Sequence, residues 1–130
     1  MKMKGYGWSN GAASILNAVA TWKGSAFAID LITRAEVELD GSPGIRGDVP
    51  GMDTRLIERC VERVLEHLGL EFGGLVRTAS QIPVASGLKS SSAAANAVVL
   101  ATLDALDVDM DLVSAARIGV EAAREVGVTI

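Results

Sequence analysis

The chain has 130 residues, of which 49% are hydrophobic, 22% are charged and 4% are aromatic, and its formal net charge is −4. This composition is typical of one globular domain, whereas the negative charge and the few aromatic side chains argue against a nucleic-acid partner, and no apolar run approaches the roughly 18 residues of a membrane span. The single cysteine, Cys60, excludes an intrachain disulfide and fits a reducing compartment. Together these features lead us to expect a cytoplasmic protein with neither a nucleic-acid nor a membrane partner.

The first third of the chain is predicted to consist mainly of strands. Met1–Tyr6 forms a short first strand, and three glycines within the first eleven residues mark a loop before a second strand at Ala13–Val19. Thr33–Leu39 alternates apolar and charged residues with the period of a half-exposed strand, and Glu36 and Glu38 share its solvated face. We expect these three strands to form hairpins at one edge of a sheet.

The clearest helix is predicted at Thr54–Leu68, after a polar connection full of turn residues between positions 41 and 51. Asp53 is a good N-cap, and Gly69 ends the helix. One face is apolar and the other is charged, so the helix is expected to pack on the core with its charges in solvent. The apolar face comprises Leu56, Ile57, Cys60, Val61, Val64, Leu65 and Leu68. His67, in the last turn, has no His or Cys partner that would indicate a metal site.

The second half is predicted to contain one strand and two helices. Gly73–Ala79 is the strand, and the helix from Ser90 to Leu106 is so poor in charge and so rich in alanine that we expect it to be buried on several sides. A final helix, Leu112–Val126, is capped by Asp109 or Asp111. Its packing candidates are Val113, Ala116, Ile118, Val120 and Ala123.

The connection between that strand and the alanine-rich helix is the most informative segment. A Gly/Ser loop opening a helix is suited to anions, because the N–H groups of the first helical turn lack intrahelical acceptors and the helix dipole is positive there. Gly87 permits close backbone approach, Lys89 adds positive charge, and three serines offer hydroxyls for capping, phosphate or Mg2+. The candidate residues are Pro83, Val84, Ala85, Ser86, Gly87, Leu88, Lys89, Ser90, Ser91, Ser92 and Ala93.

This segment has two interpretations on its own: a phosphate site, or a serine-rich N-cap of an ordinary helix. It is not a Walker A loop, because Leu88 precedes Lys89 and Pro83 stands where that motif has its first glycine. A P-loop NTPase is therefore disfavoured.

The order P-x-x-x-G-L-x-S-S from Pro83 to Ser91 resembles the second motif of the GHMP kinases, the superfamily of galactokinase, homoserine, mevalonate and phosphomevalonate kinases. Lys89 replaces the usual middle glycine, and Ser92 is an additional serine before the alanine. G-L-K-S-S-S-A followed by Asn96 is similar to the archaeal-type shikimate kinase branch. The stretches Gly11–Thr21, Gly24–Ala26 and Ile29–Leu31 resemble the same branch.

The resemblance implies an α/β (α+β) fold, the GHMP kinase N-terminal domain, which is ribosomal protein S5 domain 2-like with a mixed sheet packed against helices. Residues 1–130 would form this N-terminal ATP-binding domain, apparently truncated, with the C-terminal GHMP domain absent. The implied catalytic base, an aspartate in a T-G-A-x-D-D-like stretch, would lie beyond Ile130.

The implied activity is ATP-dependent phosphorylation of shikimate to 3-phosphoshikimate, toward chorismate and aromatic amino acids, with the 130 residues alone inactive. ATP phosphates would bind along Pro83–Ala93, and Mg2+ would reach Ser91 or Ser92 through phosphate, with the register of the serines left open. Ser14, Asn17 and Asp30 are candidates for the shikimate pocket, although Asn17 could equally be a structural hydrogen-bonding group and a structural cap or turn role is favoured for Asp30. The alternatives are another GHMP kinase acting on a small molecule, above all homoserine kinase, and a nonenzymatic nucleotide- or anion-binding domain.

Overall fold

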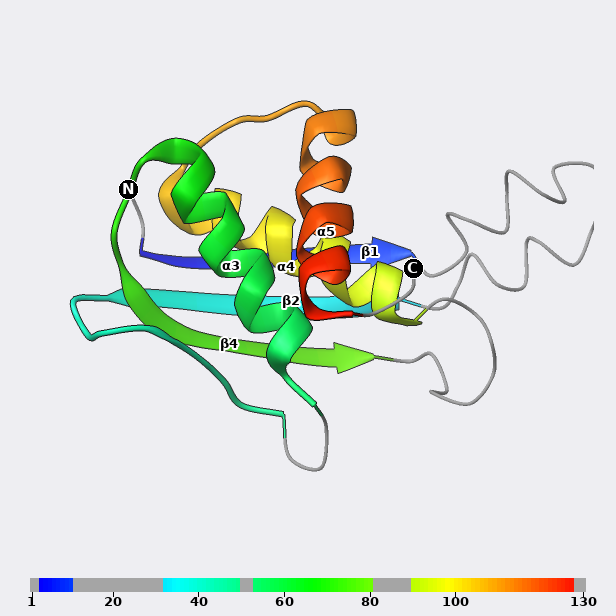
Figure 1. Cartoon of the computed structure of the whole chain (residues 1–130), viewed down its shortest axis with the longest axis horizontal. Coiled ribbons are helices and arrows are strands. Elements are labelled where there is room, and N and C mark those ends of the chain that lie inside the picture. The colour runs from blue at the N-terminus through cyan, green and yellow to red at the C-terminus, as the bar shows by residue number, and fades with distance from the viewer. Residues whose placement is uncertain (1–2, 11–31, 50–52, 81–89, 128–130) are drawn as a thin grey trace, which may run out of the picture.

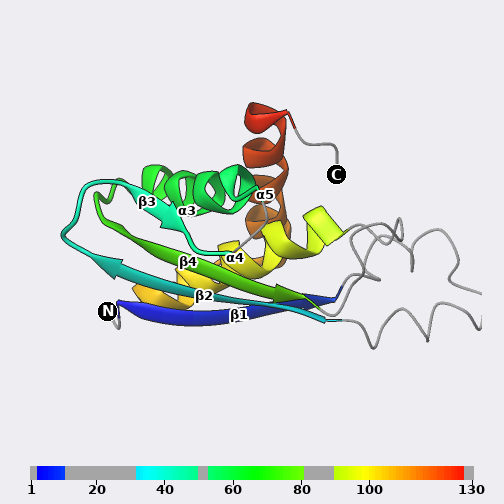
Figure 2. The same cartoon turned by 90° about the horizontal axis from the view of Figure 1, so that it is seen from below.

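A computed structural model of the chain describes residues 3–10, 32–49, 53–80 and 90–127. Within these ranges three helices lie on one side of a four-stranded sheet: two of them pack against the strands, the third packs on those two helices, and the opposite face of the sheet is open (Figures 1 and 2). The strands are β1 (Lys4–Asn10), β2 (Ile32–Asp40), β3 (Ile45–Gly47) and β4 (Gly73–Ser80), and the helices are α3 (Arg55–Leu68), α4 (Ser90–Leu106) and α5 (Leu112–Val126). This is the mixed sheet packed against helices that the sequence predicts.

The sheet has the order β1-β2-β4-β3. β2 pairs antiparallel with both β1 and β4, and β3 pairs parallel with β4. β2 is therefore an internal strand that lies beside the edge strand β1, so two of the three predicted strands pair antiparallel at one edge of the sheet. The polar connection after it also contains β3, which its turn-rich sequence concealed because three residues show no periodicity.

The first strand differs most from its prediction. The expected strand ended at Tyr6 and was followed by a glycine-marked loop, whereas β1 continues to Asn10 through both Gly5 and Gly7. A Cβ atom at Gly7 would lie 2.6 Å from the Ala101 nitrogen, and one at Gly5 would lie 2.8 Å from the Ala105 Cα. Glycine occupies these two strand positions because α4 approaches β1 too closely for a side chain. The predicted strand at Ala13–Val19 lies outside the described residues.

The helices follow the local signals closely. α3 ends at Gly69, which adopts the left-handed conformation, as the sequence predicts. Thr54, rather than Asp53, occupies its N-cap position, while Asp53 Oδ1 accepts a hydrogen bond from the Arg55 nitrogen. α5 begins after Asp111, whose side chain accepts a hydrogen bond from the Ser114 nitrogen. Of the two residues proposed to cap α5, Asp111 is thus the N-cap.

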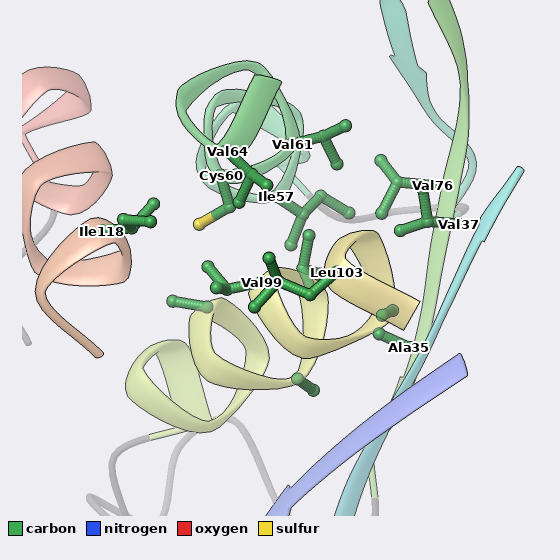
Figure 3. Close-up of a cluster of buried hydrophobic side chains, with 14 of the residues drawn as sticks. Ala35, Val37, Ile57, Cys60, Val61, Val64, Val76, Val99, Leu103 and Ile118 are labelled. Carbon is green, nitrogen blue, oxygen red and sulfur yellow. The ribbon is translucent and has the colours of Figure 1, made fainter. Parts of the chain in front are cut away.

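The core lies between the sheet and the helices (Figure 3). Val37 and Val76 from the sheet face Val61 and Val64 of α3, with Val99 of α4 in the same cluster, and all five are fully buried. Cys60 is fully buried too, as predicted. In the described ranges, no helix has the length and apolar character needed to cross a membrane.

Candidate functional site: the N-terminus of helix α4

The predicted phosphate loop lies between β4 and α4. β4 ends at Ser80 and α4 begins at Ser90, so the predicted site residues from Pro83 to Lys89 lie outside the described residues, as do the side chains of Ser90–Ser92. The backbone of the three serines forms the first turn of α4, and Ala93 is buried. The helix therefore starts at the residue that the sequence predicts, and contacts from the loop to a ligand stay a prediction.

Helix α4 runs along β1 in the opposite direction to the strand. Gly7 faces Ala97 and Ala101, Gly5 faces Ala101 and Ala105, and the Met3 nitrogen donates a hydrogen bond of 2.8 Å to the Ala105 carbonyl. The N-terminus of α4 is consequently at the end of the sheet where β1 finishes (Figure 2).

The same end of the sheet joins two segments that carry predicted site residues. Asn10 pairs with Ile32, and Thr33 pairs with Ser80, so β1 ends, β2 begins and β4 ends side by side. Residues 11–31 connect Asn10 to β2, and residues 81–89 connect Ser80 to α4. The candidates Ser14, Asn17 and Asp30 lie outside the described residues, but their segment is attached next to the N-terminus of α4.

The charge distribution of α4 favours an anion at its N-terminus. From Ser90 to Leu103 the helix has no ionisable side chain, and its only charged residue is Asp104 in the last turn. The first-turn N–H groups lack helical acceptors and carry the positive end of the dipole. No carboxylate on α4 competes with a bound anion for these donors, so the helix can stabilise phosphate charge by its backbone alone.

Helix α4 is held rigidly. It packs on β1 and β2 with one side and contacts α3 and α5 with the other, and its Asp104 Oδ2 accepts a hydrogen bond of 3.0 Å from the Tyr6 nitrogen of β1. α5 crosses near the start of α4, where a Cβ atom at Gly119 would lie 3.4 Å from the Ala95 Cβ. The buried Thr102 hydroxyl donates to the Val98 carbonyl at 2.8 Å. A helix packed on several sides gives an anion site a fixed position.

Sequence reasoning missed the residues that position α4. The glycines at positions 5, 7 and 11 suggest a loop, whereas Gly5 and Gly7 admit the backbone of α4, and no local pattern marks Asp104, which links α4 to β1. The only available signal was the alternation of glycine with exposed Tyr6 and Trp8, which is a strand period with glycine on the covered face.

Other ionisable groups have structural roles. Glu36 pairs with Lys4 at 2.9 Å on the open face of the sheet, which confirms that it belongs to the solvated side. Burial raises the pKa of the Cys60 thiol to about 12, so this cysteine is unsuited to nucleophilic chemistry. Among the residues that the structure describes, no three histidine, cysteine or acidic side chains are arranged to hold a metal ion.

Comparison with known families gives a match between residues 55–130 and the GHMP kinases N terminal domain. The chain is also similar to shikimate kinases of archaea. It is 66% identical to that of Methanothrix thermoacetophila over 128 residues and 57% identical to that of Methanosarcina mazei over 134 residues. These alignments cover 98% and 100% of this chain but 44% and 46% of the relatives. The chain thus spans about half the length of the curated relatives it matches.

Solved structures of the same fold are more distant in sequence. Homoserine kinase from Cytophaga hutchinsonii has a TM-score of 0.65 at 19% identity, and mevalonate diphosphate decarboxylase from Staphylococcus aureus has a TM-score of 0.67 at 18% identity. Each alignment covers 95% of this chain, and 42% and 43% of the respective structures. At such low identity these similarities establish the fold and leave the substrate open.

Proposed function

This chain belongs to the GHMP kinase family, and from that membership we propose that it forms the nucleotide-binding half of a shikimate kinase, which transfers a phosphoryl group from ATP to shikimate. The observation that carries the proposal is the 66% identity to the Methanothrix thermoacetophila shikimate kinase across 98% of the chain. The product would be 3-phosphoshikimate, and the reaction would take place in the cytoplasm. Homoserine kinase shares the fold, but only at 19% identity.

The part played by α4 would be electrostatic. Phosphoryl transfer requires a protein chiefly to align the reactants and to stabilise charge that spreads over the phosphate oxygens. Backbone N–H groups between Gly87 and Ser91 would bind the ATP phosphates, and Lys89 would offset further negative charge. The absence of ionisable side chains from Ser90 to Leu103 supports this role, because nothing on that stretch of α4 would repel the nucleotide.

Magnesium and shikimate would use neighbouring groups. The hydroxyl of Ser91 or Ser92 would contact Mg2+, a cation that prefers oxygen ligands and would balance phosphate charge when bound. Shikimate would bind beside the segment that contains Ser14, Asn17 and Asp30. The attachment of that segment at Asn10 and Ile32, next to the start of α4, supports a pocket shared with ATP. The general base would come from the half of the relatives' length that has no counterpart here.

A direct assay tests the proposal. The 130-residue chain is compared with a joined protein, in which the chain replaces the matching segment of the Methanothrix thermoacetophila relative. ATP-dependent phosphorylation is measured with shikimate, and with homoserine and mevalonate as control acceptors. We expect activity on shikimate only, and only in the joined protein. A folded joined protein that phosphorylates homoserine instead, or none of the three, would contradict the assignment.

Two variants of the joined protein test the loop. Lys89→Ala and Ser91→Ala should each lower kcat by about tenfold or more, because they remove groups that stabilise transition-state charge. The matched control is Lys4→Ala, which removes an exposed lysine paired with Glu36 and should leave kcat unchanged. If both loop variants keep the parental rate, the loop has no part in the mechanism.

A further inference from the structure

Helix α5 exposes most of its large aliphatic side chains to solvent. Its buried residues are mostly small: Ala115, Ile118, Gly119, Ala122 and Ala123. By contrast Leu112, Val113 and Val120 are exposed, with 74%, 69% and 41% of their surface accessible. Three of the five large hydrophobic residues that are exposed in the described ranges therefore lie on this one helix.

These exposed residues explain why the sequence prediction for α5 was partly wrong. Ile118 and Ala123 are buried as predicted, whereas Val113, Ala116 and Val120 are exposed. Valine is unfavourable on a solvent-exposed helix surface, because it has lower helix propensity than lysine or glutamate and makes no packing contacts there. Its presence at positions 113 and 120 indicates a face that becomes buried against something else.

The charges on α5 are sorted between its two sides. Arg63 of α3 forms ion pairs with Glu121 and Glu125, and Arg59 forms one with Glu125, so both glutamates are drawn toward α3. Arg117 and Arg124 are exposed, and each stands four residues after an exposed valine, which places it near the same side of the helix. Arg117 lies at the border of this side, because it also lines the hollow between α5 and α3. Within the described ranges neither arginine forms an ion pair with a carboxylate. We define the outer face of α5 as Leu112, Val113, Ala116, Arg117, Val120 and Arg124.

We propose that the outer face of α5 is the docking surface for the other half of the full-length protein, and that the patch it contacts is apolar and bordered by acidic side chains. Two observations select this occupant. The two shikimate kinases and the two solved structures described above are each more than twice as long as the part that aligns with this chain, which makes up 42–46% of their length. The matching family domain is an N-terminal one, so in such relatives the remaining chain follows α5 directly.

The side chains of the outer face indicate which side chains the partner surface should present. Removing several aliphatic side chains from water supplies the favourable free energy of association, and two exposed arginines at the border favour carboxylates opposite them. This proposal does not depend on the identity of the substrate, because none of the residues assigned to ATP or shikimate belongs to α5.

Thiol labelling tests the proposal. Single variants Val113→Cys and Val120→Cys are made in the 130-residue chain and in the joined protein, with Glu71→Cys, an exposed residue before β4, as the matched control. The native Cys60 contributes little background, because it is fully buried and burial raises its pKa. Reaction with a maleimide is followed by mass spectrometry.

We expect Val113→Cys and Val120→Cys to react roughly tenfold or more slowly in the joined protein than in the 130-residue chain, because access limits thiol reactivity, and Glu71→Cys to react equally in both. Equal rates at the two valine positions would overturn the proposal. Protection that rises with the concentration of the 130-residue chain alone would assign the face to a second copy and overturn it as well.

A second arrangement covers the case in which the joined protein does not fold. The other half of the Methanothrix thermoacetophila relative is then added as a separate polypeptide at increasing concentration. Protection of Val120→Cys that saturates, and that weakens in an Arg117→Glu/Arg124→Glu background, supports the proposal. Absence of any protection overturns it. Since labelling requires no catalysis, failure of this proposal is distinguishable from failure of the proposed kinase activity.

Discussion

Gly7 of β1 lies directly against Ala101 of α4, and a Cβ atom at residue 7 would sit 2.6 Å from the Ala101 backbone nitrogen. The contact involves main-chain atoms on the helix side, so no rotation of a side chain can relieve it. The distance between β1 and α4 is thus set by the absence of a side chain at residue 7. Because α4 carries the candidate anion site, this contact also determines where that site stands relative to the end of the sheet.

Replacing Gly7 should be costly. Gly7→Ala forces β1 and α4 apart, and overpacking of this kind lowers the free energy of unfolding by about 1–3 kcal/mol or more. Gly41→Ala is the matched control, because a Cβ atom there meets nothing within 4 Å, and its effect should stay within about 0.5 kcal/mol. Urea unfolding followed by circular dichroism measures both. A Gly7→Ala protein as stable as the parent would show that the two elements can separate freely.

The cap of α5 should give a pH-dependent contribution to stability. Hydrogen bonds from the Ser114 hydroxyl and backbone N–H lower the pKa of Asp111. A lowered native pKa means that the stabilisation is complete above the unfolded pKa, about 3.9 for aspartate, and is lost as pH falls through the lower native value. Asp111→Ala should therefore lower Tm at pH 7, and the difference from the parent should shrink below about pH 4.

Asp109→Ala is the control for this cap. Asp109 is exposed and lies two residues earlier, where it does not occupy the N-cap position. Thermal unfolding of both variants between pH 2.5 and pH 7 separates their effects. An Asp111→Ala difference that stays constant over this range would mean that the carboxylate charge contributes nothing to the cap.

Cys60 should be inert in the folded protein. With a pKa of about 12, the thiol forms at pH 8 roughly a thousandfold less thiolate than an unfolded cysteine with its ordinary pKa near 8.5. Ellman's reagent should accordingly fail to react in buffer and react fully in denaturant, with a midpoint that coincides with unfolding measured by circular dichroism. Rapid reaction under native conditions would show that α3 opens locally without global unfolding.

The ion pairs between α3 and α5 should be coupled. Arg63 is about a quarter exposed and contacts Glu121 and Glu125 from the neighbouring helix. A double-mutant cycle with Arg63→Ala and Glu121→Ala is expected to give a coupling of about 0.5–1 kcal/mol, reduced in 1 M salt. The more exposed pair Arg55–Asp53, joined within one segment, serves as the comparison and should show no measurable coupling. Equal coupling free energies in the two pairs would contradict the expectation that the interhelical pair interacts more strongly.

Local signals in the sequence were sufficient for the helices. The helices Ser90–Leu106 and Leu112–Val126 have the predicted bounds, and α3 ends before Gly69 as predicted, because capping residues such as Asp111 and helix-ending residues such as Gly69 act within one turn of the chain. The motif from Pro83 to Ser91 likewise pointed to the family to which the chain belongs, since its meaning lies in residue order alone.

Only the tertiary structure decided the roles of residues whose environment comes from distant segments. Gly5 and Gly7 look like loop residues until α4 is placed against them, and β3 is a strand because β4 supplies its hydrogen bonds. The periodicity of apolar residues also does not determine which side of α5 is buried, because both Val113 and Ala115 are acceptable core residues. The buried side is the one whose small residues, such as Gly119, allow α5 to approach α4 closely, and the two valines on the other side are left exposed.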